Sequence, residues 1–353
     1  MRILIGTYEI CGWVSLFQKE FTNLGHHCET LVKTKNYFYS NDKYTYNASR
    51  YHIKFKPRNR FVSRINNLIT KSYLNWFQKR SINNYDVVIY IWDTISPTHS
   101  DVKMFSDNGA KIIFLFTGSD IRTFSLFSQA YNVSHWEFPD YWVKENLALK
   151  KRYVETAEEF ASLIYSVPDQ SGLQKRPYYH LQIPIDLSRF VFKNNGRKIP
   201  NVLHLPSDPW KKGTDIIERT INELISEGAR INFFNYRNVK HADIPALLQD
   251  MDILVDEIVF HGPGVLSFEA MASGCAVATR YIEFSPACFR PPVWNINADN
   301  IKNKLAQLFS DFDLQQRLIV NGRKYVEQNS PSDKVAEDIL KNLANPGPPD
   351  YSV

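Results

Sequence analysis

The chain has 353 residues, of which 44% are hydrophobic and 22% charged, values typical of globular proteins. This length predicts two domains, and the composition excludes disorder, collagen and long coiled coils. The formal net charge of +5 is uneven, because residues 1–80 carry 14 Lys and Arg against four Asp and Glu, a balance of +10. The remaining residues therefore sum to −5.

The four cysteines show neither the paired spacing of a zinc site nor the density of a disulfide scaffold: Cys11, Cys28, Cys275 and Cys288. They predict reduced thiols in a cytoplasmic protein. The opening MRILIGTYEI lacks the basic stretch of a signal peptide, and no apolar run approaches about 18 residues. We therefore expect neither a membrane span nor export.

In the first half, short apolar runs alternate with amphipathic stretches. The expected strands are 2–8, 86–92 and 111–118, and the first expected helix is 14–25. Short strands that are apolar on both faces, with helices between them, are typical of a parallel sheet covered on both sides. The first half is therefore predicted to be a Rossmann-like domain.

The pattern restarts after the polar stretch 193–201. The expected strands and helices are 201–207, 214–228, 230–236, 243–250, 252–258, a helix from about 266, 275–280, 299–310, 313–328 and 332–344. We assign 1–190 to the first domain, 191–330 to a second Rossmann-like domain, and 331–353 to a helix that crosses back and a flexible tail. In open α/β sheets ligands bind beyond the carboxyl ends of the strands, so two facing domains predict a cleft lined by these loops.

The segment HLPSDPWKKGT, residues 204–214, combines a strand end, a lysine pair and a glycine before a helix. Exposed amides, the positive end of a helix dipole and an ammonium group together favour a phosphate. Ser207, Lys211 and Lys212 are the candidate ligands. The alternative is a solvated lysine pair on a turn.

The segment HGPGVLSFEAMASG, residues 261–274, places a glycine loop before an apolar helix. Its amides can face an anion or sugar hydroxyls, and Glu269 can accept two hydrogen bonds from a ribose diol. Alternatively, Glu269 only complements the helix dipole.

Two features of the first half are candidate sites. In FTGSDIRT, residues 116–123, Ser119, Asp120 and Arg122 follow a strand, although Asp120 could instead cap the next helix. Gly12 stands at the turn after the first strand. The full GxGxxG fingerprint is absent, which counts against a nicotinamide or flavin enzyme.

The segment 54–80 is basic and contains no acid. From residue 57 it has helical spacing, with Phe61, Ile65, Leu68, Ile69, Trp76 and Phe77 assigned to one apolar face. A basic amphipathic helix suits an anionic membrane surface. The alternative is a helix packed on the core with a solvated basic face.

Together these blocks resemble the retaining glycosyltransferases of GT-B fold often called family four, along most of the chain. The resemblance runs from YEICGWVSLFQKEFTNLGHH through FTGSDIR, IPIDLSRF, HLPSDPWKKGT and DILVDEI to HGPGVLSFEAMASGCAVAT. It implies an α/β protein of two Rossmann-like domains facing across a cleft. The second domain would bind the nucleotide-sugar donor and the first the acceptor.

By position, the resemblance implies that Lys212 binds the donor diphosphate and Glu269 the ribose. Gly12 resembles the first-domain glycine near the diphosphate. The donor contacts of the glycine loop match Gly262, Gly264, Val265 and Leu266.

Three positions depart from the family pattern. His261 stands where the first Glu of the E-x7-E motif is usual, and Pro209 stands near the usual basic residue, so Lys211 is a possible substitute. The usual first-domain His has no match in YIWDT, where Asp93 is the polar candidate.

The main hypothesis is transfer of a sugar from a nucleotide-sugar to a hydroxyl acceptor with retention of configuration. Positive groups aimed at the leaving diphosphate would stabilise the transition state, and the leaving phosphate would take the acceptor's proton. The residues assigned to catalysis are Lys212, His261 and Asp120, and those assigned to the acceptor are Ser119, Arg122 and Asp93. We expect no metal ion and no cofactor.

The acceptor class implied by the basic helix is a glycan or a lipid-linked acceptor of polysaccharide biosynthesis. Residues 57–80 would hold the cytoplasmic protein peripherally on the inner face of the cell membrane. Nucleic-acid binding is not expected, because no recognition motif accompanies the charge. The alternatives are a nucleotide-sugar epimerase or hydrolase on the same fold, and a non-catalytic sugar-binding protein.

Overall fold

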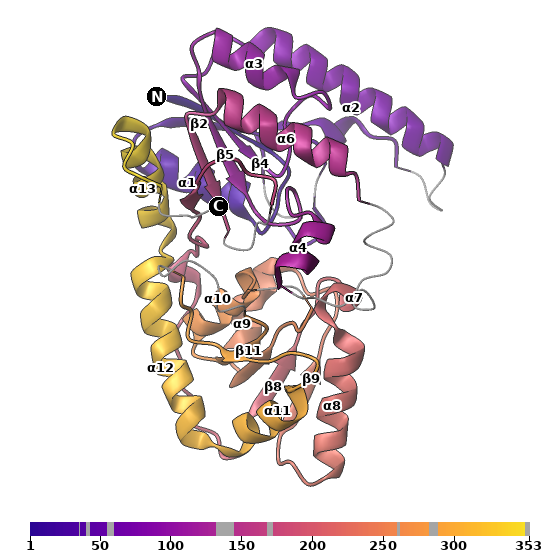
Figure 1. Cartoon of the computed structure of the whole chain (residues 1–353), viewed down its shortest axis with the longest axis vertical. Coiled ribbons are helices and arrows are strands. Elements are labelled where there is room, and N and C mark those ends of the chain that lie inside the picture. The colour runs from indigo at the N-terminus through magenta and orange to yellow at the C-terminus, as the bar shows by residue number, and fades with distance from the viewer. Residues whose placement is uncertain are drawn as a thin grey trace. The chain divides into compact units, whose positions relative to one another are not determined.

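The computed structural model of the chain describes residues 1–34, 36–39, 43–54, 60–131, 145–167, 172–259, 262–281 and 289–349 (Figure 1). The chain divides into two compact units: unit 1 comprises Met1–Leu181 and Ala336–Val353, and unit 2 comprises Gln182–Val335. The first boundary thus lies between residues 181 and 182, whereas the sequence predicts it after residue 190. Residues from Ala336 onward belong to unit 1.

Unit 1 alternates strands and helices as the apolar pattern predicts. Its elements are β1 (Arg2–Thr7), α1 (Trp13–Asn23), β2 (His27–Val32), β3 (Tyr46–Asn47), η1 (Ala48–Tyr51), α2 (Arg60–Ser81), β4 (Val87–Ile91), α3 (Ser100–Asp107), β5 (Lys111–Phe116), α4 (Phe124–Tyr131), α6 (Leu147–Phe160), β6 (Leu163–Ser166) and β7 (Tyr179–His180).

The strands of unit 1 form a seven-stranded parallel sheet in the order β3-β2-β1-β4-β5-β6-β7. The connection reverses direction between β1 and β4, which is the topological switch point of a Rossmann-type sheet. Right-handed crossovers on either side of this point place α1 and α3 on opposite faces. The helices α2, α3 and α6 share one core with inward-facing residues of the central strands (Figure 1), including Leu4, Leu74, Tyr90, Phe105, Phe114 and Tyr153.

Unit 2 repeats the plan with a smaller sheet. Its elements are η3 (Leu187–Arg189), β8 (Asn201–His204), α7 (Pro209–Lys212), α8 (Thr214–Ser226), β9 (Asn232–Asn235), η4 (His241–Asp243), α9 (Ile244–Leu248), β10 (Ile253–Val255), α10 (Val265–Ser273), β11 (Ala276–Thr279), β12 (Trp294–Asn295), α11 (Ile301–Ser310), α12 (Phe312–Asn329) and, continuing into unit 1, α13 (Ser332–Ala344).

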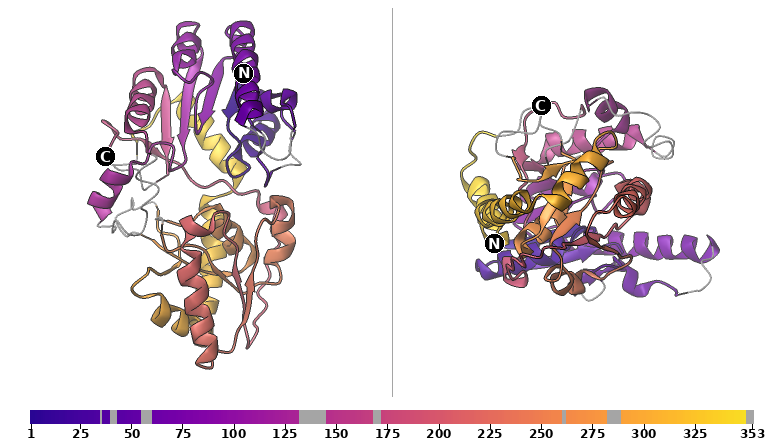
Figure 2. Two further views of the ribbon diagram at one scale, coloured as in Figure 1. Left: turned by 90° about the vertical axis from the view of Figure 1, so that its right-hand side faces the viewer. Right: turned by 90° about the horizontal axis from the view of Figure 1, so that it is seen from below.

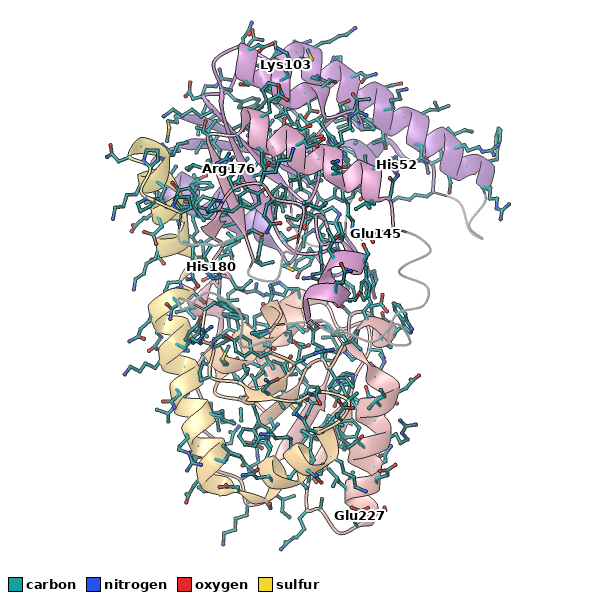
Figure 3. The ribbon with its side chains drawn as sticks, in the orientation of Figure 1. His52, Lys103, Glu145, Arg176, His180 and Glu227 are labelled. Atoms are coloured by element: carbon teal, nitrogen blue, oxygen red, sulfur yellow. The ribbon has the colours of Figure 1, made fainter. Side chains whose placement is uncertain are left out.

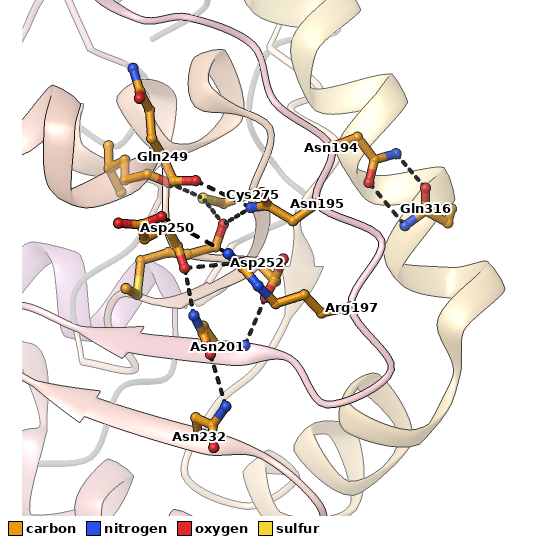
Figure 4. Close-up of polar contacts among 12 residues, drawn as sticks. Asn194, Asn195, Arg197, Asn201, Asn232, Gln249, Asp250, Asp252, Cys275 and Gln316 are labelled. Atoms are coloured by element: carbon orange, nitrogen blue, oxygen red, sulfur yellow. Dashed lines mark hydrogen bonds and ion pairs between the residues drawn. The ribbon is translucent and has the colours of Figure 1, made fainter.

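The five strands of unit 2 are parallel in the order β12-β11-β10-β8-β9. This is the flavodoxin-like order, and its switch point lies between β8 and β10. The amino ends of the same strands are tied by a polar network (Figure 4). Arg197 Nη1 lies 3.0 Å from Asp252 Oδ2, which also accepts the N–H of Asn201 at 2.8 Å. This network does not involve the carboxyl ends of the strands, where ligands bind in open α/β sheets.

The C-terminal helix α13 returns to unit 1, as the sequence predicts. Lys111 Nζ donates to the carbonyl of Leu343 at 3.2 Å, and Asn342 Nδ2 donates to the hydroxyl of Tyr165 at 2.8 Å. Of the predicted flexible tail, residues 350–353 lie outside the described residues.

The basic helix α2 differs from the single apolar stripe predicted for it. Phe77 is buried, whereas Phe61, Leu68 and Trp76 are 69%, 64% and 48% exposed. At 100° per residue these three side chains fall within about 80° of arc, roughly opposite the buried face. The Arg60 end of the helix extends beyond the sheet (Figures 1 and 2). No helix of the described residues has the length and apolar character needed to span a membrane.

Candidate functional site

At the switch point of unit 2, two loops follow β8 and β10. After β8, the side chain of Asp208 accepts the N–H of Lys211 and caps the short helix α7. Gly213 ends α7 with a φ of 71°, and a Cβ there would lie 2.5 Å from Cγ1 of Ile258. Only glycine suits both the backbone and the contact. This turn directs Lys212 toward the end of β10.

Lys212 is the centre of a buried ionic group that we name the Lys212 cluster: Lys212, Asp256, Glu257 and Ser267. Lys212 Nζ lies 2.9 Å from Asp256 Oδ1 and 2.5 Å from Glu257 Oε2. The hydroxyl of Ser267 donates to Asp256 Oδ2 at 2.7 Å. Both carboxylates directly follow β10, so the strand end supplies two acids to one lysine.

The cluster shifts the titration of its members. Burial would lower the pKa of Lys212, but the carboxylates of Asp256 and Glu257 outweigh burial and raise it. Burial would raise the pKa of Asp256, yet the Lys212 ammonium and the hydrogen bond from Ser267 lower it below its ordinary value. Lys212 is therefore a permanent cation that faces Asp256 and Glu257.

The glycine loop lies against this cluster. Gly262 has a φ of 90° and donates its N–H to the carbonyl of Arg280 at 3.1 Å. A Cβ on Gly264 would lie 3.5 Å from Lys212 Nζ and 3.6 Å from Asp256 Oδ2. Val265 and Leu266 open α10, whose N-terminus has no side-chain cap among the described residues. His261, assigned to catalysis from the sequence, lies outside the described residues.

Glu269, a buried residue of α10, is joined to a histidine that the sequence did not indicate. Its Oε1 lies 2.5 Å from His241 Nε2, while Arg189 Nη1 lies 3.2 Å from His241 Nδ1. A guanidinium can only donate, so Nδ1 of His241 is the acceptor and Nε2 carries the proton that it donates to Glu269. Arg189 thus holds His241, and His241 orients the Glu269 carboxylate. The bond to His241 involves Oε1 of Glu269 and not Oε2.

The remaining donor candidates lie at the surface of the same loop. Ser207 is exposed, and Lys211 forms an ion pair of 3.3 Å with Asp208 in which both side chains are nearly half exposed. Lys211 and Lys212 are adjacent in the sequence but differ in environment.

At the switch point of unit 1 lies a cavity of about 240 Å³ that we name the unit 1 pocket. Its walls come from the loops that follow β1, β4 and β5, from the residue that precedes α3, and from α6. The lining residues are Tyr8, Trp92, Asp93, His99, Ser119, Asp120, Asn146, Leu149, Lys150 and Tyr153. Three sequence candidates, Asp93, Ser119 and Asp120, are therefore brought together. The lining residues His99 and Tyr153 were missed, because no spacing in the sequence connects α3 with α6.

Asp120 is committed to its own loop. Its carboxylate accepts the N–H groups of Thr117 at 2.9 Å, Gly118 at 2.7 Å and Ile121 at 3.1 Å. Burial raises the pKa of Asp120 to about 6 although these hydrogen bonds oppose the shift. Asp120 thus holds its own turn, and it does not cap the next helix, α4, whose Phe124 N–H is accepted by Glu145.

The start of α4 is held by a different carboxylate, that of Glu145. Glu145, labelled in Figure 3, accepts the N–H of Phe124 at 2.9 Å and pairs with Lys150 at 3.1 Å. Lys150 also donates to the backbone carbonyl of Arg122, which is 7% exposed. Arg122 is not one of the residues that line the pocket as the described residues define it. Arg122 lies in the loop between β5 and α4.

Two further candidates in unit 1 have intramolecular partners. Asp93 Oδ2 lies 2.6 Å from Lys33 Nζ, a lysine whose side chain is 9% exposed. Gly12 precedes α1 with a φ of 75°, but the carboxylate of Glu9 accepts the N–H groups of Val14 at 3.1 Å and Ser15 at 3.2 Å. A carboxylate therefore already holds the first amides of this helix.

Among the described residues, no three His, Cys, Asp or Glu side chains gather in a way that could hold a metal ion.

No protein-family model and no curated protein matches the sequence. Solved structures do match, and they show that the two α/β units form a GT-B fold, as the sequence predicts. Sucrose-phosphate synthase from Thermosynechococcus elongatus superposes with a TM-score of 0.64 at 12% identity, covering 97% of this chain and 98% of that one.

Two others are similar along their whole length. WaaG, a glycosyltransferase involved in lipopolysaccharide biosynthesis, has a TM-score of 0.60 at 12% identity and covers 98% of this chain and 100% of its own. HepE of Anabaena, in complex with UDP-glucose, has a TM-score of 0.58 at 13% identity, with 98% and 99% covered. At sequence identities of 12% and 13%, the similarity to these structures shows the fold alone.

Proposed function

We propose that the protein transfers a glycosyl group from a nucleoside-diphosphate sugar, of the UDP-sugar class, to a hydroxyl acceptor. One observation carries this proposal. At the switch point of unit 2, the backbone of Gly264 lies against Lys212 at the start of α10, and Glu269 follows on the same helix. The GT-B neighbours support it, since HepE was solved with UDP-glucose.

Lys212 is suited to hold a diphosphate despite its two acids. An ammonium has three N–H donors, and two of them serve Asp256 and Glu257. The third is directed to the ligand in this proposal, beside the amides of Val265 and Leu266 at the positive end of the helix dipole. The two carboxylates fix the lysine in place and keep it charged while it binds.

Glu269 is assigned to the nucleotide. In this proposal Oε2 accepts a ribose hydroxyl, while Oε1 stays with His241. Because Arg189 holds the other ring nitrogen, the imidazole cannot turn away without losing a second bond. The carboxylate is thereby preorganised for binding.

For the reaction we propose retention of configuration. The bond from the anomeric carbon to the diphosphate oxygen breaks, and a bond from the same carbon to the acceptor oxygen forms on the same face. The acceptor's proton passes to the leaving phosphate oxygen, whose charge Lys212 and the α10 amides stabilise. No protein nucleophile is needed, and we expect activity to survive EDTA.

Titration of the protein with UDP by calorimetry tests the donor site. We expect UDP to bind, and Glu269→Gln to weaken it by about tenfold, the effect of one hydrogen bond to a charged group. Glu218→Gln is the control, because Glu218 pairs with Arg237 on the exposed side of α8. Equal affinities for all three proteins would remove Glu269 from the site, and absence of UDP binding would remove the proposal.

Helix α2 supports a location at the cytoplasmic face of a membrane, with a glycan or lipid-linked acceptor of polysaccharide biosynthesis. Phe61, Leu68 and Trp76 are exposed on one side of the helix, and Arg64 and Lys71, also exposed, flank them. Aromatic and aliphatic side chains beside basic ones bind anionic bilayers through both burial and charge.

Co-sedimentation with phosphatidylglycerol vesicles at low salt checks this location. We expect binding that falls with added salt and disappears when Phe61, Leu68 and Trp76 are all replaced by Ser. Replacing the exposed Met104 on α3 by Ser is the matched control. If wild type and the triple variant sediment alike, α2 does not bind membranes.

A further inference from the structure

Two residues that line the unit 1 pocket each have a buried polar atom without a hydrogen-bond partner among the described residues, Nε2 of His99 and Oη of Tyr153. Each residue is only 4% exposed, and their ring centroids are 5.0 Å apart. Buried polar groups are almost always paired, so two such atoms in one pocket require an explanation. We propose that His99 and Tyr153 form a clamp for one hydroxyl group of a sugar ring.

The hydrogen-bond network fixes which proton His99 carries. Thr94 Oγ1 donates its hydrogen to the carbonyl of Ser96 at 2.9 Å, and it lies 2.9 Å from His99 Nδ1. Since its own hydrogen is committed, Thr94 must accept from Nδ1–H. Burial lowers the pKa of His99, so the ring is neutral. Nε2 therefore has a bare lone pair, and it can only accept a hydrogen bond.

Tyr153 supplies the opposite function. Burial, reinforced by nearby carboxylates, raises the pKa of its phenol well above the ordinary value, so the group keeps its proton. Its ring is fixed by edge contacts with Phe114 and Phe116, at 5.5 and 5.4 Å between centroids. The hydroxyl of Tyr153 is thus a donor on a fixed ring, whose centroid lies 5.0 Å from that of the His99 ring.

A hydroxyl group satisfies both atoms at once, because it donates one hydrogen bond and accepts others. A carboxylate or phosphate would offer no proton to Nε2, and an ammonium would offer no lone pair to the phenol. The remaining walls include two aromatic residues, Tyr8 and Trp92. A volume of about 240 Å³ lies below the about 300 Å³ of drug-sized sites and fits a single ring.

This inference deepens the proposed glycosyl transfer and rests on it for the identity of the sugar. The hydroxyl belongs to the acceptor sugar or to the sugar of the donor. Both sources share the chemistry that the clamp recognises, and titrations with different ligands distinguish them.

Two substitutions remove one function each. Tyr153→Phe deletes the donor and keeps the ring. His99→Asn deletes the acceptor Nε2, whereas an amide N–H can still reach Thr94, and Asn tolerates the left-handed φ of 59° found here. The control is Tyr178→Phe, because Tyr178 is also buried but its hydroxyl donates to Glu158 at 2.8 Å.

The probes are methyl α-D-glucopyranoside, methyl α-D-galactopyranoside and UDP-glucose, titrated by NMR against the full chain. We expect Tyr153→Phe and His99→Asn each to weaken at least one probe by about 3- to 10-fold, the effect of one hydrogen bond. Loss with a methyl glycoside alone identifies the acceptor sugar, and loss with UDP-glucose but not UDP identifies the donor sugar. Tyr178→Phe should bind as wild type does.

Stability provides a readout that a purely structural tyrosine would not give. Tyr153→Phe removes an unpaired buried hydroxyl, so we expect an equal or higher melting temperature together with weaker binding. Tyr178→Phe should lower the melting temperature. The clamp is refuted if no probe binds wild type, if both clamp variants bind every probe unchanged, or if Tyr153→Phe only lowers stability. Binding of methyl glycosides without binding of UDP would instead refute the proposed donor.

Discussion

Unit 1 and unit 2 share one plan, a parallel sheet whose strand order reverses beside its first strand, but they fill that point with different chemistry. In unit 2 the candidate side chains are paired with one another: Lys212 with two carboxylates, and Glu269 with His241. In unit 1 the pocket retains a neutral acceptor and a neutral donor. A paired ionic network suits a charged ligand that exchanges hydrogen bonds with it, whereas unpaired neutral groups suit a hydroxyl.

Two buried histidines, His204 in unit 2 and His99 in unit 1, differ in how many of their ring nitrogens have hydrogen-bond partners. His204 in β8 lies 2.7 Å from the carbonyl of Val255 through Nδ1 and 2.9 Å from Thr214 Oγ1 through Nε2. Both of its nitrogens are satisfied, so its role is to hold the start of α8 beside β10. His99 has only its Nδ1 satisfied. A buried histidine with one open nitrogen, unlike His204, points to a ligand.

The largest expected effect is on the Lys212 cluster. Lys212→Met leaves two buried carboxylates without their cation, and we expect it to lower the free energy of unfolding by about 3–5 kcal/mol. Lys211→Met is the matched control, since its pair with Asp208 is exposed and contributes about 1 kcal/mol or less. Urea unfolding measures both. Similar small losses would mean that the cluster is not held by its charges.

The next effect is the pH dependence that His204 confers. Burial lowers the pKa of His204 from 6.5 to about 4, so between these values the unfolded chain takes up a proton that the folded chain does not. Stability therefore falls as pH falls through this window, by about 3 kcal/mol.

His204→Asn keeps a donor for Val255 and cannot titrate, so its stability should lack this part of the slope. The difference between wild type and variant is measured by urea unfolding at several pH values, where contributions of other groups such as Asp120 cancel. Parallel curves would show that His204 titrates normally.

Alanine substitutions at two glycines of unit 2 should distinguish an effect on stability from an effect on ligand binding. Gly213→Ala should destabilise by about 1–3 kcal/mol, because φ is 71° and the new Cβ meets Ile258. Gly264→Ala should change stability by less than about 0.5 kcal/mol, since its φ of −78° is ordinary. Its methyl group would nevertheless stand 3.5 Å from Lys212 Nζ and weaken UDP binding. Undiminished UDP affinity in Gly264→Ala would place the phosphate elsewhere.

Strands and long helices were predictable because each has a local signature. Strands such as β4 and β8 are buried on both faces and so appear as continuous apolar runs, and α8 shows a helical period bounded by glycines. The helix α2 was located correctly, but its apolar residues divide between two faces. Only contacts with the sheet decide which of them are buried.

The partners inside the sites were not predictable in this way. Lys212 and Asp256 stand 44 positions apart, and His241 and Glu269 stand 28 apart. These pairs form because parallel strands bring their carboxyl ends to one edge of the sheet, a relation that no sequence spacing encodes. The acids after β10 did offer a signal, since DILVDEI ends its apolar run in two carboxylates. His99 and Tyr153 offered none.

The smallest expected effect concerns Gly12 and the start of α1. The carboxylate of Glu9 accepts the N–H of Val14 and the N–H and hydroxyl of Ser15. Glu9→Gln should lower stability by about 1 kcal/mol, because an amide caps a helix less well than a carboxylate. If the diphosphate binds to unit 2 alone, UDP affinity should not change. If it also approaches the amides beside Gly12, removal of the Glu9 charge should tighten UDP severalfold. Calorimetry of UDP binding to Glu9→Gln therefore decides whether Gly12 belongs to the donor site.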